Sequence, residues 1–519
     1  MTSALPMATR ARWLPGQIEN WPERRIVVAL TLGAAAIRLY LTFTSFCISG
    51  DGAEYISMAH HFAAGETGKA LASVFSPLYP LLISLLHRIV PDWELCGNLT
   101  SAALGTATIP LLYFLMAEVF ERRSVAIGAA ALAAIHPLMA EYSASVRTEA
   151  GFISLMLAAL CLFMSGIRSK QLARIAFAGA VGGIAYLYRV EAIGLLIVCV
   201  AFLFLGAVAW KTWDLKSATR WALGFAALFL MVASPYMIYL RSSTGHWTIG
   251  RELSAAMAFG VAQMVEDKSG WQISGLRGNV SILTPLLTEP RAYLRKVVHD
   301  LAMSFYAFPM ATGPLLFALL AIGLWIRGRA ILGNWRESLL ALLVAFYFVG
   351  FSFSYTGTRF MLHLIPYTFG WMMLGLEACS RWLARRRMPG GRFMPESTLS
   401  VIVALTLLPS TLWPIGYDIR GLRYAGEDIA RRGQAMPGIV ARDGRVAFYA
   451  EGKLIELPLA PEPDLCRWIA GKREAQYLVV SRREERRLGD LRGRRCLSLV
   501  KRYPRGRDSY YDLFQINRE

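Results

Sequence analysis

Residues 191–210 read EAIGLLIVCVAFLFLGAVAW, and their one charged side chain, Glu191, stands at the start. A helix of this length rises about 30 Å, which matches the hydrocarbon core of a bilayer. Similar apolar runs recur along the chain. We therefore predict a mainly α, polytopic transmembrane helical bundle of about eleven spans, near 26–46, 97–118, 124–141, 149–166, 172–188, 191–210, 219–240, 300–326, 338–355, 359–377 and 398–416.

The composition supports a membrane protein. Hydrophobic residues make up 55% of the 519 residues and charged residues 18%, with a formal net charge of +19. In the predicted membrane region the positive charge falls in short clusters between apolar runs, whereas a nucleic-acid-binding protein would gather it on one soluble domain. The composition excludes a soluble multidomain enzyme, a disordered chain and a secreted disulfide scaffold, and we expect no nucleic-acid partner.

The basic clusters also predict the orientation. Cytoplasmic connections of membrane proteins are enriched in Lys and Arg. The short basic connections of this chain all fall on the cytoplasmic side if residues 1–25 form a cytoplasmic N-terminal segment and the apolar stretch 77–90 does not cross the bilayer. We therefore interpret 77–90 as an interfacial or re-entrant helix. The predicted domains are this N-terminal segment, a transmembrane domain at 26–416 with exterior loops at 47–96 and 241–299, and an exoplasmic (periplasmic) region at 417–519. The expected location is the plasma membrane (the inner membrane of a bacterium), which the chain crosses several times among membrane lipids.

The C-terminal region changes character. Alternating apolar runs at 444–449 and 477–481 predict strands and 461–474 predicts a helix, which together suggest a small α/β domain. Cys466 and Cys496 would share an oxidising compartment, so a disulfide between them is compatible with the sequence, although spacing alone does not establish it.

The first candidate site residue is Asp51, which lies between two glycines just beyond the first predicted span. Glycines let a ligand approach the backbone closely, although an Asp here is also a good helix N-cap. The amphipathic helix that follows carries Glu54 and Tyr55, which we include as candidate substrate contacts.

Three further candidate sites fall at the same predicted rim. Glu149 begins a span and could be a partner of the helix dipole alone. Arg189 and Glu191 lie at a helix–helix turn, where they could form a structural ion pair. Arg359 lies at a helix N-terminus, where the dipole disfavours a cation unless an anion is near; contact with lipid phosphate is the alternative. Arg38 and His363, within predicted spans, are expected to make bundle contacts.

Two carboxylates and two arginines at one water-accessible rim suit displacement at a carbon whose leaving group is phosphate. A carboxylate can accept the acceptor's proton, and guanidinium groups match phosphate oxygens. Glu54, His60 and His61 suggest a divalent metal as an alternative, but adjacent His residues on a helix point in different directions, so no metal ligand is assigned. No cofactor is certain.

The order of these motifs resembles a known group. Asp51 to Tyr55, Ser76-Pro77-Leu78-Tyr79-Pro80, His136-Pro137, Arg147-Thr148-Glu149, the run from Ala185 to Glu191 and the run from Arg359 to Pro366 are similar to the GT-C superfamily of membrane glycosyltransferases, in the branch of protein O-mannosyltransferases and lipid A aminoarabinose transferases. The resemblance covers about residues 26–380.

This resemblance implies a polyprenyl-phosphate-linked sugar donor and an exoplasmic lipid, glycan or protein acceptor. It implies that Asp51 is the catalytic carboxylate, that Glu149 is the second acid, and that Arg189 and Arg359 bind the donor phosphate. The expected reaction is an inverting single displacement. The main alternative is a transporter or flippase of a lipid-linked or anionic substrate, which would commonly show internal repeats; a non-catalytic scaffold is the second.

Overall fold

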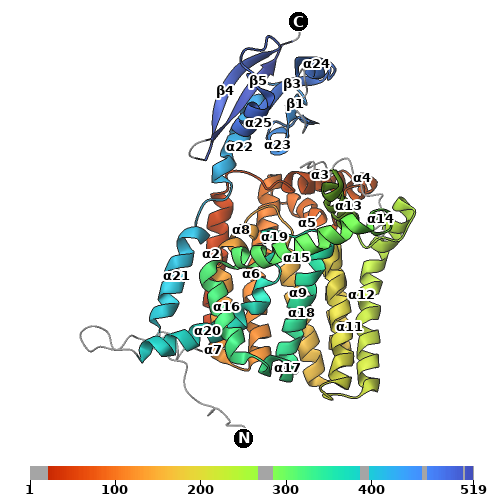
Figure 1. The fold of residues 1–519 in the computed structure, drawn as a ribbon, viewed down its shortest axis with the longest axis vertical. Coiled ribbons are helices and arrows are strands. Elements are labelled where there is room, and N and C mark those ends of the chain that lie inside the picture. Colours follow the sequence, from red (N-terminus) through yellow and green to blue (C-terminus); the bar gives the residue numbers. More distant parts are fainter. Residues whose placement is uncertain (1–21, 267–283, 386–396, 459–464, 507–508, 518–519) are drawn as a thin grey trace, which may run out of the picture.

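The computed structural model describes residues 22–266, 284–385, 397–458, 465–506 and 509–517. A helical bundle forms the body of the molecule and a small α/β domain stands on one end of it (Figure 1). The bundle contains α2 (Glu23–Phe43), α6 (Trp93–Phe120), α7 (Arg123–Ile135), α8 (Pro137–Tyr142), α9 (Glu149–Ser169), α10 (Leu172–Tyr188), α11 (Ile193–Val208), α12 (Leu215–Thr244), α16 (Pro314–Arg327), α17 (Ala330–Gly333), α18 (Trp335–Phe353), α20 (Ile365–Ala384) and α21 (Thr398–Thr411).

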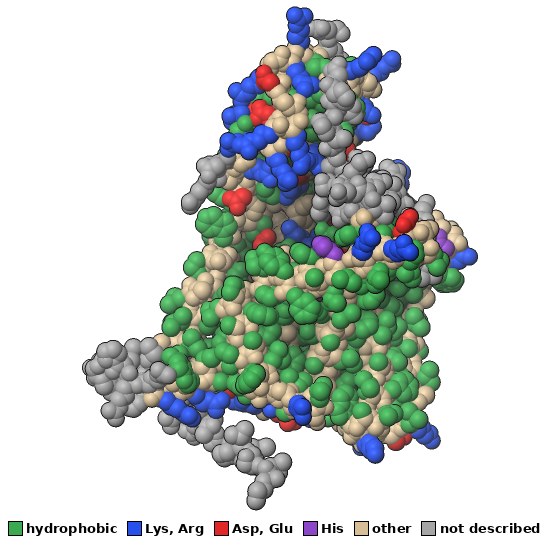
Figure 2. All heavy atoms as spheres, in the orientation of Figure 1, with side chains coloured by type: hydrophobic (Ala, Val, Ile, Leu, Met, Phe, Trp, Pro, Cys, Tyr) green, Lys and Arg blue, Asp and Glu red, His purple; other side chains and the backbone are tan. Residues whose placement is uncertain are grey.

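Within the described ranges, six helices are long and apolar enough to cross a bilayer, and a bent pair would make a seventh span. Their outer surface is a band of hydrophobic side chains between two ends that carry charges (Figure 2). At the end opposite the α/β domain, predicted basic connections pair with acids, as in Arg168–Glu118 and Arg122–Glu377. These features confirm the predicted fold class of a membrane bundle.

Glycines let neighbouring helices approach closely. A Cβ added at Gly179 of α10 would lie 2.0 Å from the carbonyl oxygen of Phe225 in α12, and one added at Gly323 of α16 would lie 1.8 Å from that of Trp371 in α20. Small residues at such contacts bring backbones together, and van der Waals packing then holds the helices. This packing fixes the connections at the rim that carry the candidate site.

Seven further helices of the described ranges, 4 to 23 residues long, lie across the end of the bundle that faces the α/β domain (Figure 1). They are α3 (Gly52–Ala63), α4 (Thr67–Leu71), α5 (Leu78–His87), α13 (Arg251–Glu266), α14 (Thr284–Thr288), α15 (Pro290–Thr312) and α19 (Thr358–Met361). Helix α5 covers the apolar stretch predicted not to cross. Its ten residues rise about 15 Å, half the thickness of the hydrocarbon core.

The span predicted at 300–326 differs from the structure. Helices α15 and α16 meet there at a bend of 108°. Gly313 has a φ of +85°, a conformation that glycine adopts readily, and Pro314 begins the next helix without needing a backbone N–H donor. Helix α15 consequently lies along the rim, and only α16 runs through the bundle (Figure 1).

The C-terminal domain is built on a five-stranded sheet with strand order β2-β1-β3-β5-β4, in which β1 pairs in parallel with β2 and β3 while β5 is antiparallel to β3 and β4. Its elements are η3 (Tyr417–Ile419), α22 (Arg420–Ala430), β1 (Gly438–Ala441), α23 (Arg445–Tyr449), β2 (Lys453–Glu456), α24 (Leu465–Ala470), β3 (Ala475–Ser481), α25 (Arg482–Leu488), β4 (Leu497–Arg505) and β5 (Ser509–Ile516).

The predictions for this domain are confirmed in part. The strand predicted at 477–481 lies within β3, and Cys466 and Cys496 form a disulfide. The strand predicted at 444–449 is wrong, because these residues form helix α23. The helix predicted at 461–474 is present only as α24, which ends at Ala470; residues 471–474 are not helical, and residues 461–464 lie outside the described part of the chain.

Candidate functional site

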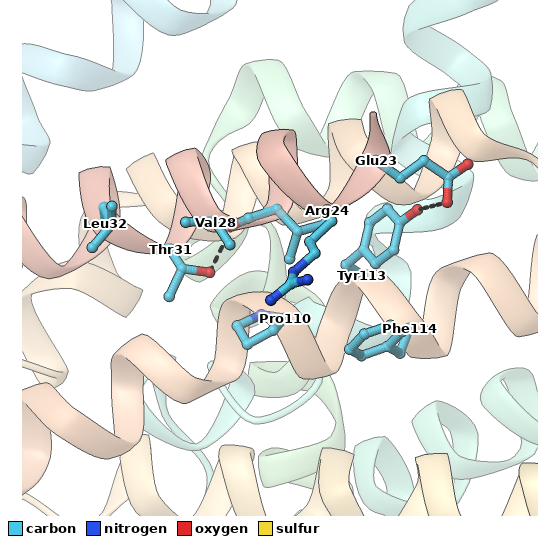
Figure 3. Close-up of a pocket in the computed structure, with 9 residues that line it drawn as sticks. Glu23, Arg24, Val28, Thr31, Leu32, Pro110, Tyr113 and Phe114 are labelled. Atoms are coloured by element: carbon cyan, nitrogen blue, oxygen red, sulfur yellow. Dashed lines mark hydrogen bonds between the residues drawn. The ribbon is translucent and has the colours of Figure 1, made fainter. Parts of the chain in front are cut away.

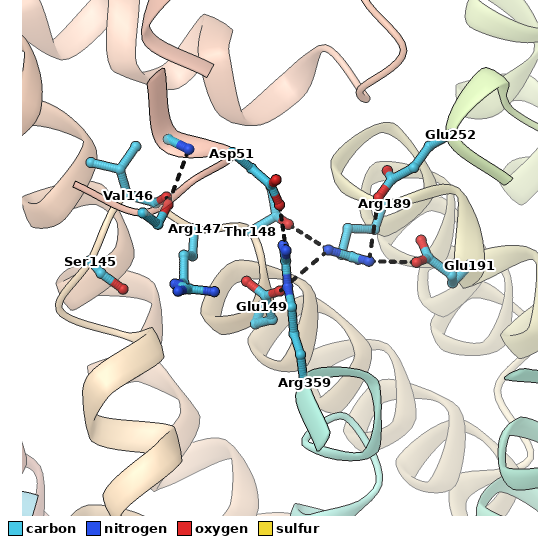
Figure 4. A network of polar contacts seen from close by, with 12 residues as sticks. Asp51, Ser145, Val146, Arg147, Thr148, Glu149, Arg189, Glu191, Glu252 and Arg359 are labelled. Carbon is cyan, nitrogen blue, oxygen red and sulfur yellow. Dashed lines mark hydrogen bonds and ion pairs between the residues drawn. The ribbon is translucent and has the colours of Figure 1, made fainter. Parts of the chain in front are cut away.

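Four connections at the rim bring the candidate side chains together (Figure 4). Asp51 directly precedes α3, Glu149 is the first residue of α9, Arg189 follows α10, and Arg359 lies in the single-turn helix α19. Helices α9 and α10 pack side by side, and the starts of α3 and α19 meet at their rim ends, so residues as distant in the chain as Asp51 and Arg359 become neighbours.

Arg359 joins the two predicted acids. Its Nε donates to Oε1 of Glu149 and its Nη1 donates to Oδ2 of Asp51. The guanidinium group therefore neutralises both carboxylates at once. Arg359 lies at the start of α19, where the helix dipole disfavours a cation unless an anion is near. In this structure the carboxylates of Glu149 and Asp51 are those anions.

Arg189 lies deeper, among carboxylates. Its Nη2 donates to Oε1 of Glu191 at 2.6 Å and its Nη1 donates to the hydroxyl of Thr148 at 2.8 Å. The same Nη1 is 3.6 Å from Oε1 of Glu149. The ion pair predicted between Arg189 and Glu191 is present, and Arg189 and Arg359 both face Oε1 of Glu149.

The exposure of these side chains falls from the rim inwards. Asp51 is 32% exposed and Arg359 24%, whereas Arg189 is 2% exposed and Glu149 is fully buried. A soluble group would therefore meet Asp51 and Arg359 first, while Arg189 and Glu149 form the floor of the site.

Several buried polar atoms of this floor have no hydrogen-bond partner among the described residues: Oε2 of Glu149, Oε2 of Glu191, Nε of Arg189 and Nη2 of Arg359. Buried polar atoms are normally paired, by protein, water or ligand. Unsatisfied atoms clustered in this way mark a place where bound molecules complete the hydrogen bonding.

Tyr55 and Glu54, adjacent on α3, differ in their surroundings. The Tyr55 ring is buried and its hydroxyl lies 3.5 Å from the Thr148 hydroxyl. Burial, with the carboxylates of Glu252 and Asp51, raises the pKa of Tyr55 well above its usual value, so Tyr55 remains protonated. Glu54 is exposed and accepts a hydrogen bond from Ser73, outside the network.

The sequence analysis missed Glu252, whose Oε1 lies 3.8 Å from Nη2 of Arg189. Glu252 belongs to α13, in a connection without a recognisable motif. Burial raises the pKa of its carboxyl to about 7, an effect that Arg189 opposes and Glu191 reinforces. Four carboxylates therefore surround the guanidinium groups of Arg189 and Arg359 (Figure 4). They belong to Asp51, Glu149, Glu191 and Glu252.

The remaining candidates have other surroundings. Arg38 is buried and donates to backbone carbonyl oxygens of Ala34, Ala133 and Ala134, which is the predicted bundle contact. His363 is buried against Phe152, with ring centroids 4.9 Å apart. No group of three or more His, Cys, Asp or Glu residues in the described ranges is arranged to hold a metal ion, so we assign no metal ligand.

An apolar groove of about 540 Å³ lies elsewhere, between α2 and α6 (Figure 3). Glu23 and Arg24 line it from the beginning of α2 and Tyr113 lines it from α6, whereas Asp51 follows the other end of α2. A helix of 21 residues is about 30 Å long, so this groove is separate from the charged network.

Comparisons with known proteins agree with this architecture. The family model for dolichyl-phosphate-mannose-protein mannosyltransferase matches residues 75–239. This segment contains Glu149, Arg189 and Glu191, whereas Asp51 and Arg359 lie outside it. No curated protein matches the sequence.

Solved structures extend the likeness over nearly the whole chain. The apo oligosaccharyltransferase of Archaeoglobus fulgidus has a TM-score of 0.61 at 13% identity, covering 90% of this chain and 70% of that one. ArnT from Cupriavidus metallidurans bound to undecaprenyl phosphate has a TM-score of 0.56 at 14% identity, covering 95% of this chain and 97% of that one. The family model and the architecture together show that this chain has the fold of the GT-C superfamily of membrane glycosyltransferases.

Proposed function

We propose that the protein transfers a sugar from a polyprenyl-phosphate donor to an acceptor at the exoplasmic face of the plasma membrane. The observation that carries this proposal is the bridge from Arg359 to both Asp51 and Glu149 at the half-open rim of a membrane bundle. The Asp51 carboxylate, which can accept a proton, thus lies beside the Arg359 guanidinium group, which can bind a phosphate. Both lie next to a bilayer that can contain a polyprenyl tail.

The same geometry suggests the course of the reaction. The acceptor oxygen or nitrogen attacks the anomeric carbon and its proton passes to the Asp51 carboxylate. The bond from the anomeric carbon to the phosphate oxygen breaks, and polyprenyl phosphate leaves with the electron pair. Arg359 stabilises the charge that develops on this oxygen. Because attack and departure occur on opposite faces of one carbon, the configuration inverts.

Arg359 changes partners in this scheme. In this structure Oδ2 of Asp51 is occupied by the hydrogen bond from Arg359. When the donor phosphate binds Arg359, it competes with Asp51, and the released Asp51 can then accept the proton. Glu149 stays buried and keeps the guanidinium group oriented.

The other site residues support this pair. Arg189, which is 2% exposed and held by Thr148 and Glu191, is less accessible than Arg359, so we assign the first phosphate contact to Arg359 and a positioning role to Arg189. Tyr55 supports the floor through Thr148. Two similar structures agree with the proposed substrates: ArnT is bound to undecaprenyl phosphate, and one oligosaccharyltransferase structure is tethered to an acceptor peptide.

The test is a reaction with purified full-length protein and a polyprenyl-phosphate sugar labelled in the sugar. A glycosyltransferase releases unlabelled polyprenyl phosphate and moves the label to an acceptor in a membrane extract. A transporter or flippase would move the intact donor across proteoliposomes without breaking its sugar–phosphate bond, and that result would replace the proposal.

A further inference from the structure

A second, polar pocket of about 340 Å³ lies between the C-terminal domain and the Asp51 loop. Arg442 and Asp443, which follow β1, and Ser481, at the end of β3, line it from the domain side. Gly50 lines it from the bundle side. In α/β sheets, ligands bind outside the carboxyl ends of parallel strands, and β1 and β3 are such a parallel pair.

The position of Gly50 connects this pocket with the proposed reaction. The Cα atoms of Gly50 and Asp51 are about 3.8 Å apart, as in any trans peptide. The Asp51 side chain turns towards Arg359 of the bundle (Figure 4), whereas Gly50 faces the C-terminal domain. A molecule that extends from the pocket past Gly50 would therefore approach Asp51 from the side away from Arg359.

The loop that carries both residues is attached to the C-terminal domain. The Phe46 N–H donates to the Ile415 carbonyl oxygen at 2.8 Å, and Cys47 is buried in the apolar core that also contains Leu422 and Val446. The Ile48 N–H donates to the Tyr449 hydroxyl at 2.6 Å. These contacts hold the pocket in a fixed relation to Asp51.

The charges of the pocket favour an anion. Arg445 pairs with Asp443 through two hydrogen bonds of 2.8 and 2.5 Å, and Arg442 lies 3.8 Å from Glu484. Arg505 lines the same pocket, its guanidinium group 5.1 Å from the centre of the Tyr511 ring, and it has no carboxylate partner among the described residues. One positive charge thus remains uncompensated beside hydroxyl and carboxylate groups that can bind sugar hydroxyls.

We infer that this pocket is the acceptor subsite, and that it binds an anionic sugar, bearing a phosphate or a carboxylate, through Arg505. The inference rests on the proposed function, because it supplies the molecule that Asp51 deprotonates. The volume of the pocket, about 340 Å³, lies at the lower end of the range for small-molecule sites, about 300–1,000 Å³. This volume suits a single sugar unit.

The first test is calorimetric titration of the full-length protein in nanodiscs with glucose 1-phosphate, glucuronate and glucose. We expect both anions to bind at least tenfold more tightly than glucose, and Arg505→Gln to weaken both at least tenfold. The matched control is Lys501→Gln, which removes one positive charge from an exposed position of the same strand, β4. Absence of anion binding, equal binding of glucose, or equal losses in the two variants would overturn the inference.

The second test is Gly50→Leu. A Cβ at Gly50 has no neighbouring atom within 4 Å, so the larger side chain would enter open space at the pocket wall. We expect a raised KM for the acceptor with an unchanged KM for the donor. An unchanged acceptor KM would contradict the subsite. Binding of the labelled donor to the wild-type protein distinguishes the two failures: its absence contradicts the proposed function, and its presence without binding of anionic sugars contradicts only this inference.

Discussion

Arg359 and Asp51 lie 308 residues apart in the chain, yet the guanidinium group of one donates to the carboxylate of the other at the rim of the bundle. Glu149 accepts from the same guanidinium group, so the pair cannot be altered without affecting the floor of the site. This relationship makes distinct predictions for each of the three residues.

Asp51→Asn keeps the shape of this side chain and one acceptor oxygen for Arg359 but removes the negative charge and the basicity. General base catalysis commonly contributes about 100- to 10,000-fold, so we expect the rate of sugar transfer to fall by that factor while the donor still binds. Transfer of labelled sugar and donor binding would be measured separately. Glu289→Gln, which neutralises an exposed acid just before α15, serves as the control. Full transfer activity in Asp51→Asn would remove Asp51 from the proposed mechanism.

Glu149 and Arg359 should be energetically coupled. Removing one member of this ion pair leaves the other with a single partner, Asp51 for Arg359 or Arg189 for Glu149. Glu149→Gln and Arg359→Gln should therefore each lower the free energy of unfolding by about 1–3 kcal/mol. The double variant should cost about 1–3 kcal/mol less than the sum of the single variants. Denaturant unfolding of the four proteins in detergent measures this coupling, and strictly additive losses would contradict the pairing.

Glu252 should make stability depend on pH. Burial raises the pKa of its carboxyl from 4.5 to about 7, so over this interval the folded protein binds a proton that the unfolded chain has lost. The contribution of Glu252 to the free energy of unfolding should therefore fall as the pH rises from 4.5 to 7. Melting temperatures of the wild type and Glu252→Gln, compared from pH 4.5 to 8, should diverge in this sense. Parallel pH profiles would show that Glu252 titrates normally.

The orientation in the membrane can be tested with single cysteines. Gln434 is exposed in the C-terminal domain, and Arg329 is exposed at the opposite end of the bundle. If the C-terminal domain is exoplasmic, Gln434→Cys should react with a membrane-impermeant maleimide in intact cells, and Arg329→Cys only after the cells are opened. The five cysteines outside the disulfide are buried or half-buried, which limits background labelling. The reverse pattern would invert the topology.

The sequence predicted the main helices because each needs only a long apolar run, a local property. The bend at Gly313 was missed although its signal, glycine followed by proline, is visible in the sequence. The span at 300–326 was predicted from its number of apolar residues, and a single Gly-Pro dipeptide hardly changes that number. Residues 444–449 were assigned to a strand because a short apolar stretch is compatible with either structure. They form a helix in the domain core, where Val446 and Ala447 are buried.

The candidate site shows the same limit. Asp51, Glu149, Arg189 and Arg359 could be selected because ionisable residues at a membrane rim are costly and each follows or begins a predicted span. Which arginine holds which acid depends on helix packing, and spacing along the chain does not encode it. Glu252 carried no such signal, because its position depends on how α13 crosses the rim. For Glu54 a signal was available: adjacent helical residues point about 100° apart, so Glu54 and Tyr55 could not share one face.

The burial of Cys47 in the core of the C-terminal domain restricts how this protein can be divided or recombined. Removing residues 417–519 would leave the membrane helices intact but expose an apolar side chain and free the chain on which the proposed base is mounted. A replacement domain from another protein would have to offer a cavity for that thiol and a hydroxyl in place of Tyr449. These contacts join the two halves of the molecule at the loop that precedes Asp51, so substitutions at their junction should have to change together.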